Sequence, residues 1–346
     1  MANDAITHFH EAITAVRAQA AAPQPPETMV RDALKAYLRS LDPYSGYLTP
    51  QEYATGKDVA DAAYAGVGMD LFPDHDGSLV CIPFPGGPAA QAGVRYGDVL
   101  VAVDGAPVRG LGVLDIGVRV RGQKGSPVSL AVASPGASPR TVELKRDTIA
   151  FRSVAVFAKA KPLPVIRIYR FGDATRRELK KAIASIGLLT DKIIDLRGTI
   201  GGDLEEAMAC AKLFLESGQT IASLHSPSGE VVYTVDREPS DLFSRLFIWQ
   251  DRMTAGEAEA FVSGLVLNGR AMSMGQRTFG KGSVQSVVGL SDGSAVVVTH
   301  GLLHAANGKV FDGVGLEPDV SIPPESAGDD AFFAKEVEKA LKPGLL

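Results

Sequence analysis

Apolar residues recur at helical spacing near the start of the chain. They occupy one face of residues 5–21, at Ile6, Phe9, Ile13 and Val16. This spacing predicts an amphipathic helix, which the PQPP segment at 23–26 ends. A second apolar stripe predicts another helix over 27–41. The Pro, Gly and Asp residues of LDPYSGYLTPQEY, at 41–53, then predict a structured turn.

From about residue 64 the pattern changes to short alternating strands separated by glycine. The segments of this kind are GVGMDLF, GSLVCIPF, DVLVAVDG and VSLAVAS. Two short helical segments, at 87–93 and 111–122, lie among them. Short strands with two short helices, over residues 64–147, predict a compact, β-rich module that folds around its own core.

After KRDTI the chain alternates between apolar strands and amphipathic helices. The predicted strands are PVIRIYRF, KIIDLRG, RLFIWQD and AMSMGQ, and the predicted helices are TRRELKKAIASIG, LEEAMACAKLFLESG and GEAEAFVSGLVLNG. Such alternation predicts a largely parallel sheet covered on both faces. The closing stretch adds strands, turns and a terminal helix, DDAFFAKEVEKAL.

Composition and charge narrow the classes of function. At 346 residues the chain is long enough for more than one core. Its net charge is −5 without any cluster of Lys and Arg, which argues against a nucleic-acid partner. No apolar run reaches the roughly 18–20 residues that cross a bilayer. Cys81 and Cys210 are too few for a disulfide framework and are interpreted as small buried residues.

The chain start, MANDAITHFH, lacks the basic and apolar regions of a secretion signal. Either the protein is cytoplasmic or a targeting segment has been removed, and the sequence leaves both alternatives open. Four histidines, His8, His10, His300 and His304, have no converging partners that would make a zinc site, so no metal is expected.

The loop TFGKGS, at 278–283, is compatible with two kinds of chemistry. A phosphate cradle would need the pattern G-x-x-x-x-G-K-[ST] between a strand and a helix. Lys281 is instead followed by Gly282, and the strand-like SVQSVVGL comes next. The loop is therefore better interpreted through the motifs that accompany it.

Those motifs appear in a characteristic order. They are LDPYSGYLTPQEY, then GVGMDL with GPAAQAGVRYGDVLVAVDG, then IIDLRGTIGGDLEEAMACAKLFL, then GRAMSMGQRTFGKGSVQ, then DGVGLEPDV. The chain from about residue 40 to 322 thereby resembles the carboxy-terminal processing peptidases of the S41 class, in which a PDZ domain accompanies an α/β core. The resemblance implies a serine nucleophile, a lysine base and a glutamine that orients the lysine, with no cofactor. It also implies a periplasmic location if a targeting segment has been removed.

Residue by residue, the resemblance assigns the base to Lys281 and its orienting partner to Gln285. It assigns the oxyanion site to Gly201, Gly202 and Glu257. The family's nucleophile motif, S-A-S-A-S-E, corresponds here to TAGEAE, residues 254–259, which places Gly256 where the serine should be.

A glycine at that position has a direct chemical consequence. A buried lysine can lose its proton far below its usual pKa of about 10.4 and act as a base. The hydroxyl that it deprotonates must lie within roughly 2.6–3.2 Å. Gly256 offers no hydroxyl, so acyl transfer from this position is excluded. The accompanying changes at Thr254 and Glu257 favour a natural loss over a single introduced replacement.

Thr254, Ser283 and Ser273 carry hydroxyls near Gly256 and Lys281 in the sequence. Thr254 is interpreted as a residue that caps the following helix. Ser283 is expected to point away from Lys281 if its segment is extended, and Ser273 lies on a predicted strand. None is an attractive substitute nucleophile.

The PDZ-like module carries a second candidate site. Its Gly-rich turn, Gly66, Val67, Gly68 and Met69, precedes a strand and could direct N–H groups at a peptide's terminal carboxylate. The alternative is that these glycines only make a tight turn.

The predicted fold is α/β, with an S41-peptidase-like core, an inserted PDZ-like domain and an N-terminal helical segment. The predicted boundaries are 1–60 for the helical segment, 64–147 for the PDZ-like domain, 148–325 for the core and 326–346 for the terminal helix and tail. The preferred function is binding of C-terminal segments of peptides or proteins by an inactive peptidase homologue. The alternatives are an active endopeptidase with a displaced hydroxyl, and an assembly scaffold paired through the N-terminal helices.

Overall fold

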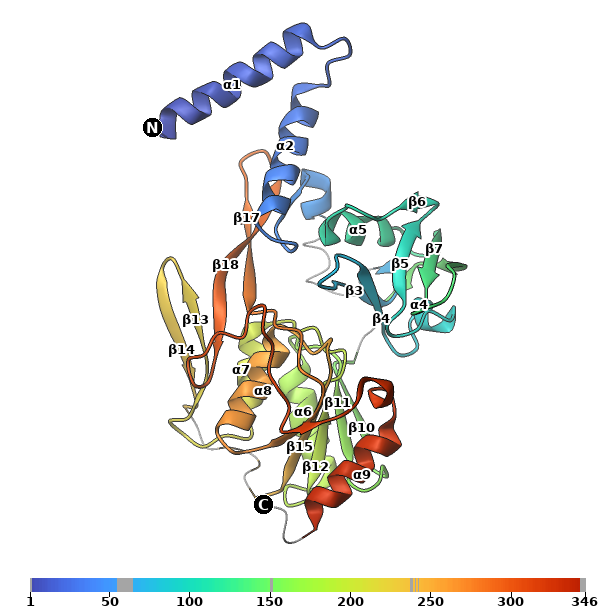
Figure 1. Cartoon of the computed structure of the whole chain (residues 1–346), viewed down its shortest axis with the longest axis vertical. Coiled ribbons are helices and arrows are strands. Elements are labelled where there is room, and N and C mark those ends of the chain that lie inside the picture. The colour runs from blue at the N-terminus through green and yellow to red at the C-terminus, as the bar shows by residue number, and fades with distance from the viewer. Residues whose placement is uncertain are drawn as a thin grey trace.

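The computed structural model describes residues 2–54, 65–149, 152–236, 239, 241 and 243–342. A helical arm, a β-rich domain and an α/β core are distinct in Figure 1. Among these residues no helix is long and apolar enough to cross a membrane. The architecture confirms the predicted fold class.

The arm contains α1 (Ala2–Gln19) and α2 (Pro26–Leu41), which project from one end of the molecule (Figure 1). Pro26 can begin α2 because the first N–H groups of a helix need no partner. The carboxylate of Asp42 then accepts the N–H groups of Tyr44 and Ser45, both at 2.7 Å, and so closes the turn predicted after α2.

The β-rich domain is an antiparallel sheet with two short helices. Its elements are β2 (Ala65–Gly66), β3 (Met69–Pro73), β4 (Leu79–Pro83), α4 (Pro88–Gln91), β5 (Val99–Val103), β6 (Ala106–Pro107), α5 (Val113–Val120), β7 (Pro127–Ala133), β8 (Arg140–Lys145) and β9 (Asp147–Thr148). The strand order β3-β4-β5-β7-β8 leaves β3 at one edge. Ile116 and Leu130 are fully buried in a core of its own.

The α/β core contains a six-stranded sheet. Its strands, in order, are β10 (Val154–Phe157), β11 (Val165–Ile168), β12 (Lys192–Asp195), β15 (Leu246–Gln250), β16 (Met272–Gly275) and β19 (Val320–Ser321). Only β10 runs antiparallel to its neighbour. The predicted parallel sheet is therefore confirmed.

Helices cover both faces of this sheet, because successive side chains of a strand point to opposite sides. Ile194 and Ile248 pack with α6 (Thr175–Ile186), α7 (Leu204–Ala211) and α8 (Glu257–Leu267). Ile193 and Phe247 pack instead with Phe333 and Val337 of α9 (Asp330–Leu341).

A second, antiparallel sheet was not predicted as a unit. It joins β1 (Gly46–Leu48), β18 (Ala295–Ala305), β13 (Thr220–Ser226), β14 (Gly229–Thr234) and β17 (Ser283–Gly289). The helix predicted over 204–218 is wrong beyond Ala211, where α7 ends. Leu213, Phe214 and Leu215 are all buried, so their apolar run reflects burial in a turn rather than one face of a helix.

The β-rich domain packs against the core near the start of α8. The ring of Phe72 meets that of Phe279 edge-on at 4.7 Å, and His75 stacks on Phe279 at 4.2 Å. The Tyr96 hydroxyl donates to Asp251 at 2.5 Å. These contacts cover the loop that contains Lys281 with residues from another domain.

Candidate active site

Gly256 lies in the turn between β15 and α8, where it is the residue that caps the helix. Its φ of 63° and ψ of −130° are rarely adopted by residues with a side chain. A Cβ added there would lie 3.3 Å from the carbonyl oxygen of Ile200. The backbone therefore turns sharply at this position, and glycine meets it without strain.

Thr254 does not cap α8, which corrects the sequence-based expectation. Its hydroxyl accepts the N–H of Asp251 at 3.0 Å and donates to the carbonyl of Leu196 at 3.0 Å. The side chain is fully buried. Because this hydroxyl fastens the turn to the neighbouring strand end, it is committed to the fold rather than directed at Lys281.

Glu259 connects the Gly256 turn to the loop of Lys281. Its buried carboxylate accepts N–H groups from Gly256 at 3.1 Å, Gly280 at 2.7 Å and Lys281 at 2.8 Å. The Thr278 hydroxyl donates a fourth bond at 2.5 Å. Burial raises the pKa of Glu259 to about 7, although these donors oppose the rise. The sequence did not single out this function of Glu259.

Lys281 and Gln285 lie together. The Lys281 Nζ donates to Gln285 Oε1 at 3.0 Å and to the carbonyl oxygen of Ser283 at 2.6 Å. Gln285 in turn donates to the Thr299 hydroxyl at 3.0 Å, which holds the amide in place. Burial lowers the pKa of Lys281, while the nearby charge of Glu257 acts in the opposite direction.

The surroundings of Lys281 include an aromatic ring that sequence reasoning missed. Its Nζ lies 4.7 Å from the centre of the Tyr44 ring, which comes from the turn after α2. The LDPYSGYLTPQEY motif marked this segment, but only the fold brings it to Lys281. The Ser283 Oγ has no hydrogen-bond partner, and no hydroxyl in the described part of the chain bonds to Lys281 Nζ.

The oxyanion residues show an arrangement specific to this chain. The N–H of Gly202 donates to Oε2 of Glu257 at 2.9 Å. Glu257 is buried, and its Oε2 packs so tightly on Gly201 that a Cβ there would lie 2.1 Å away. A carboxylate of the chain itself therefore occupies the N–H donor that the resemblance assigns to an acyl oxygen.

In the PDZ-like turn, the carbonyl groups of Val67 and Gly68 are hydrogen-bonded, whereas their N–H groups have no acceptor among the described residues. Val67 accepts the N–H of Ala89 at 2.8 Å, and Gly68 accepts that of Phe84 at 2.9 Å. Neither the Val67 nor the Gly68 N–H donates to another residue within the described ranges. Gly66 pairs with Asp147 in β2–β9, and the Val67 and Met69 side chains are buried in the domain core.

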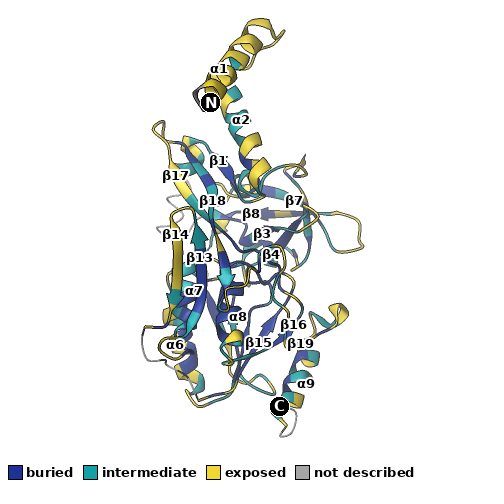
Figure 2. Cartoon of the chain, turned by 60° about the vertical axis from the view of Figure 1, so that its left-hand side comes forward, coloured by how far each residue is buried: buried dark blue, intermediate teal, exposed yellow. Residues whose placement is uncertain are grey.

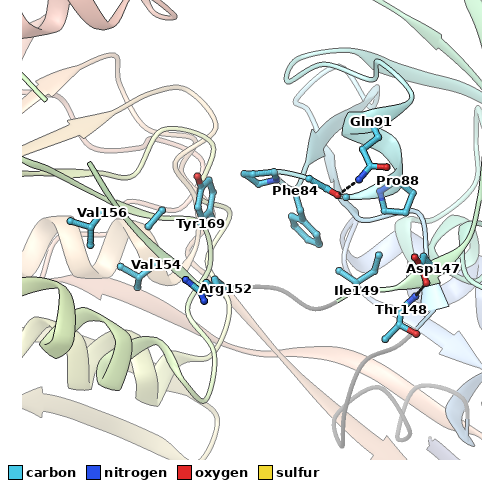
Figure 3. A pocket seen from close by; sticks show the side chains of 14 residues that line it. Phe84, Pro88, Gln91, Asp147, Thr148, Ile149, Arg152, Val154, Val156 and Tyr169 are labelled. Atoms are coloured by element: carbon cyan, nitrogen blue, oxygen red, sulfur yellow. Dashed lines mark hydrogen bonds between the residues drawn. The ribbon is translucent and has the colours of Figure 1, made fainter. Parts of the chain in front are cut away.

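A cleft of about 770 Å³ lies beside this turn (Figure 3). Phe84, Pro88 and Gln91 form one wall, and Arg152 and Tyr169 approach from the core. Its lining includes neither Lys281 nor Gly256. The open space next to the PDZ-like turn is thus separate from the Lys281 centre.

Comparisons with known proteins agree with this architecture. Residues 163–322 match peptidase family S41, and residues 84–134 match the PDZ domain. The chloroplastic C-terminal processing peptidase of Tetradesmus obliquus is 30% identical over 315 residues, covering 85% of this chain and 68% of the relative. The carboxyl-terminal-processing protease of a Picosynechococcus species is 32% identical over 296 residues, covering 83% and 71%.

A solved structure extends the agreement to the arrangement of the domains. The photosystem II D1 C-terminal processing protease superposes with a TM-score of 0.77 at 28% identity, over 93% of this chain and 89% of that protein. The chain is therefore a member of peptidase family S41, a PDZ-containing homologue of the carboxy-terminal processing peptidases.

Proposed function

We propose that this protein does not cleave peptides and instead binds the C-terminal segments of other proteins through its PDZ domain. The observation that carries the proposal is the Glu257 carboxylate on the N–H of Gly202, next to a Gly256 that has no side chain.

Loss of the hydroxyl removes the nucleophile. The Lys281 amine donates to the Ser283 carbonyl and to Gln285, neither of which can form an acyl intermediate. The hydroxyl of Thr254 is taken up by Leu196 and Asp251. Lys281 therefore lies in surroundings that suit a general base, but no hydroxyl of the described residues bonds to it and could be deprotonated.

Glu257 removes the second catalytic requirement. A tetrahedral intermediate of acyl transfer develops negative charge on its oxygen, and a preorganised donor stabilises that charge. Here the Gly202 N–H already bonds to a carboxylate. An incoming carbonyl would have to displace this group and would then develop its charge beside another negative charge. The two residues that cause these losses, Gly256 and Glu257, are adjacent in the chain.

The PDZ domain retains what peptide binding needs. The N–H groups of Val67 and Gly68, which have no acceptor among the described residues, can donate to a terminal carboxylate, and β3 begins directly after them. At the two ends of β3, Gly68 is hydrogen-bonded to Phe84 and Asp74 to Ser78, both on the side of β4. Backbone groups alternate in direction along an antiparallel strand, so those of Met69 and Leu71 point to the unpaired edge of β3. A peptide could add there as a further strand.

Binding should depend on the terminal carboxylate. We expect peptides with apolar C-terminal residues to bind at least about tenfold more tightly as free acids than as amides, since a charged hydrogen bond contributes roughly 1.5–3 kcal/mol. Calorimetric titration of the matched pair measures the difference. Equal affinities would contradict recognition of the chain end.

The variant Gly68→Ala tests the site itself. The added Cβ would lie 2.8 Å from Pro88 at a φ of 68°, so the turn must distort and the preference for the free acid should disappear. Gly328→Ala is the matched control, because a Cβ there meets no atom within 4 Å. A folded Gly68→Ala protein that keeps the preference for the free acid would show that the carboxylate binds elsewhere.

Peptide fragments that form with the wild-type protein and disappear with Lys281→Ala would favour the endopeptidase alternative.

A further inference from the structure

We infer that the PDZ domain has a second specificity pocket for its bound peptide. Peptide positions are counted back from the terminal residue, which is position 0. The pocket takes an apolar side chain at position −4 and an acidic side chain at position −6. The inference rests on the proposed function, because it concerns the same peptide, and it adds a part of that peptide that the turn at Gly68 does not reach.

The place of the terminal carboxylate sets the register of the peptide on β3. A carboxylate at the N–H groups of Val67 and Gly68 lies at the start of β3, so the peptide runs antiparallel to this strand. Met69 then lies opposite the terminal residue, and Leu71 lies opposite position −2. In the same register, Pro73 lies opposite position −4.

Strand pairing with the peptide ends at Pro73. This residue is the last of β3 and has no N–H to donate to an added strand. The chain then turns back, because the N–H of Asp74 donates to the carbonyl of Ser78 at 2.8 Å. The side chain at position −4 lies on the face that Pro73 shares with Met69 and Leu71, which pack on the core of the PDZ domain.

A pocket of about 670 Å³ begins at Pro73. Leu79 lines it from β4, and Val113 lines it from the start of α5. Val101 of β5, which is 38% exposed, and Pro43 contribute further apolar surface. A large apolar side chain at position −4 would cover these groups and remove them from water. Because the pocket continues from the end of β3, its geometry favours the upstream part of the bound peptide over a separate ligand.

Two guanidinium groups at the pocket favour an acidic residue upstream. Arg109 is exposed and has no ion pair among the described residues. Arg39 comes from the end of α2, beside the β-rich domain (Figure 1), and its Nη1 lies 3.5 Å from the carbonyl oxygen of Gly110 and 3.9 Å from Oδ2 of Asp115. Asp76 is the one carboxylate among the described lining residues, so positive charge exceeds negative charge there. Positions −4 and −6 share a face of an extended peptide, which places the acid at position −6.

Calorimetric titration with free-acid peptides of seven residues tests position −4. The two peptides share their last four residues and differ only at position −4, which is Phe in one and Ser in the other. We expect the Phe peptide to bind at least about tenfold more tightly, since it buries a large apolar side chain. A four-residue peptide with the same ending should keep the preference for the free acid and lack this gain.

The outcomes separate this inference from the proposed function. Equal affinities of the Phe and Ser peptides, with the preference for the free acid intact, would overturn the pocket and leave the proposed function standing. Loss of the preference for the free acid, or a protein that binds none of these peptides, would reject the proposed function and with it the register on which the pocket depends.

The variant Val101→Glu tests the pocket itself. Val101 is exposed, so the variant should fold, and a charge on the apolar wall should reduce the gain from Phe at position −4 to less than about twofold. Val231→Glu is the matched control, because it places the same charge on β14, which Figure 2 shows as exposed, and it should keep the full gain. A folded Val101→Glu protein that also keeps the full gain would overturn the inference.

The variant Arg109→Gln tests the acidic position. At low ionic strength, Glu at position −6 should bind about threefold more tightly than Gln, as exposed ion pairs allow. Arg109→Gln should lose this preference, whereas Arg177→Gln, which removes an exposed charge from α6 of the core, should keep it. A wild-type protein without a preference for Glu at position −6, or a preference that Arg109→Gln keeps in full, would overturn the acidic part of the inference.

Discussion

The double variant Gly256→Ser/Glu257→Ala should acquire a reactive nucleophile, whereas wild-type protein has none. The serine supplies a hydroxyl at the start of α8, and removal of the Glu257 carboxylate frees the Gly202 N–H for an acyl oxygen. One oxyanion donor is worth about a hundredfold to a thousandfold in rate. We therefore expect the double variant to react at least about a hundredfold faster than Gly256→Ser alone.

A small serine-reactive phosphonofluoridate is the appropriate probe, because it does not depend on how the PDZ domain admits a peptide. The covalent adduct is detected by mass spectrometry of the intact chain, and its site by peptide mapping. Adding Lys281→Ala to the double variant should abolish labelling. Glu205→Ala in place of Glu257→Ala is the matched control, since it removes a carboxylate from the first turn of another helix.

Stability has to be measured alongside reactivity. A serine at a φ of 63° costs about 1–3 kcal/mol, and its Cβ lies close to the Ile200 carbonyl. A double variant that melts like Gly256→Ser but labels no faster would contradict the proposed inhibitory effect of Glu257 on the oxyanion site. Labelling of wild-type protein at any side chain would contradict the proposed loss of catalysis.

The reactivity of the double variant should rise with pH. Only a neutral Lys281 can accept the proton of the new hydroxyl, so the rate increases as pH rises through the pKa of Lys281. Burial places that pKa below the usual value of about 10.4. Loss of the Glu257 charge, which acts against this lowering, should move the midpoint lower still.

Glu259→Ala should produce the largest loss of stability. The substitution leaves the N–H groups of Gly256, Gly280 and Lys281 without their acceptor, together with the Thr278 hydroxyl. Each buried donor without a partner costs about 1–3 kcal/mol. Allowing for water entering the space, we expect the free energy of unfolding to fall by about 3 kcal/mol or more, and the melting temperature by about 10 °C.

Calorimetry of Glu259→Ala beside Glu257→Ala makes the comparison. Among the described residues Glu257 accepts a single hydrogen bond, from Gly202, so its removal should cost only about 1 kcal/mol. Equal melting temperatures for the two variants would show that Glu259 does not hold the Gly256 turn to the Lys281 loop. We propose that this structural function explains why TAGEAE contains Glu259 although it holds no serine.

Regular periodicity made the helices and the parallel sheet predictable. The apolar stripe of α2 and the strand–helix alternation of the core are local patterns, and each is set by which face of an element is buried. Prediction failed at Leu213–Leu215, where burial in a turn produces an apolar run that resembles the continuation of α7. The antiparallel sheet could not be predicted from the sequence either, because β1 pairs with β18 across some 250 residues of chain.

The candidate site likewise has a part that the sequence predicts and a part that only the tertiary structure reveals. The sequence alone determined that a hydroxyl is missing at Gly256 and that Lys281 and Gln285 accompany one another, since residue type and motif order are local facts. Only the tertiary structure decided that Tyr44 lies over Lys281, that Glu259 joins two loops, and that Glu257 bonds to Gly202. Side-chain direction at a helix start depends on what packs around it, and those neighbours come from distant segments of the chain.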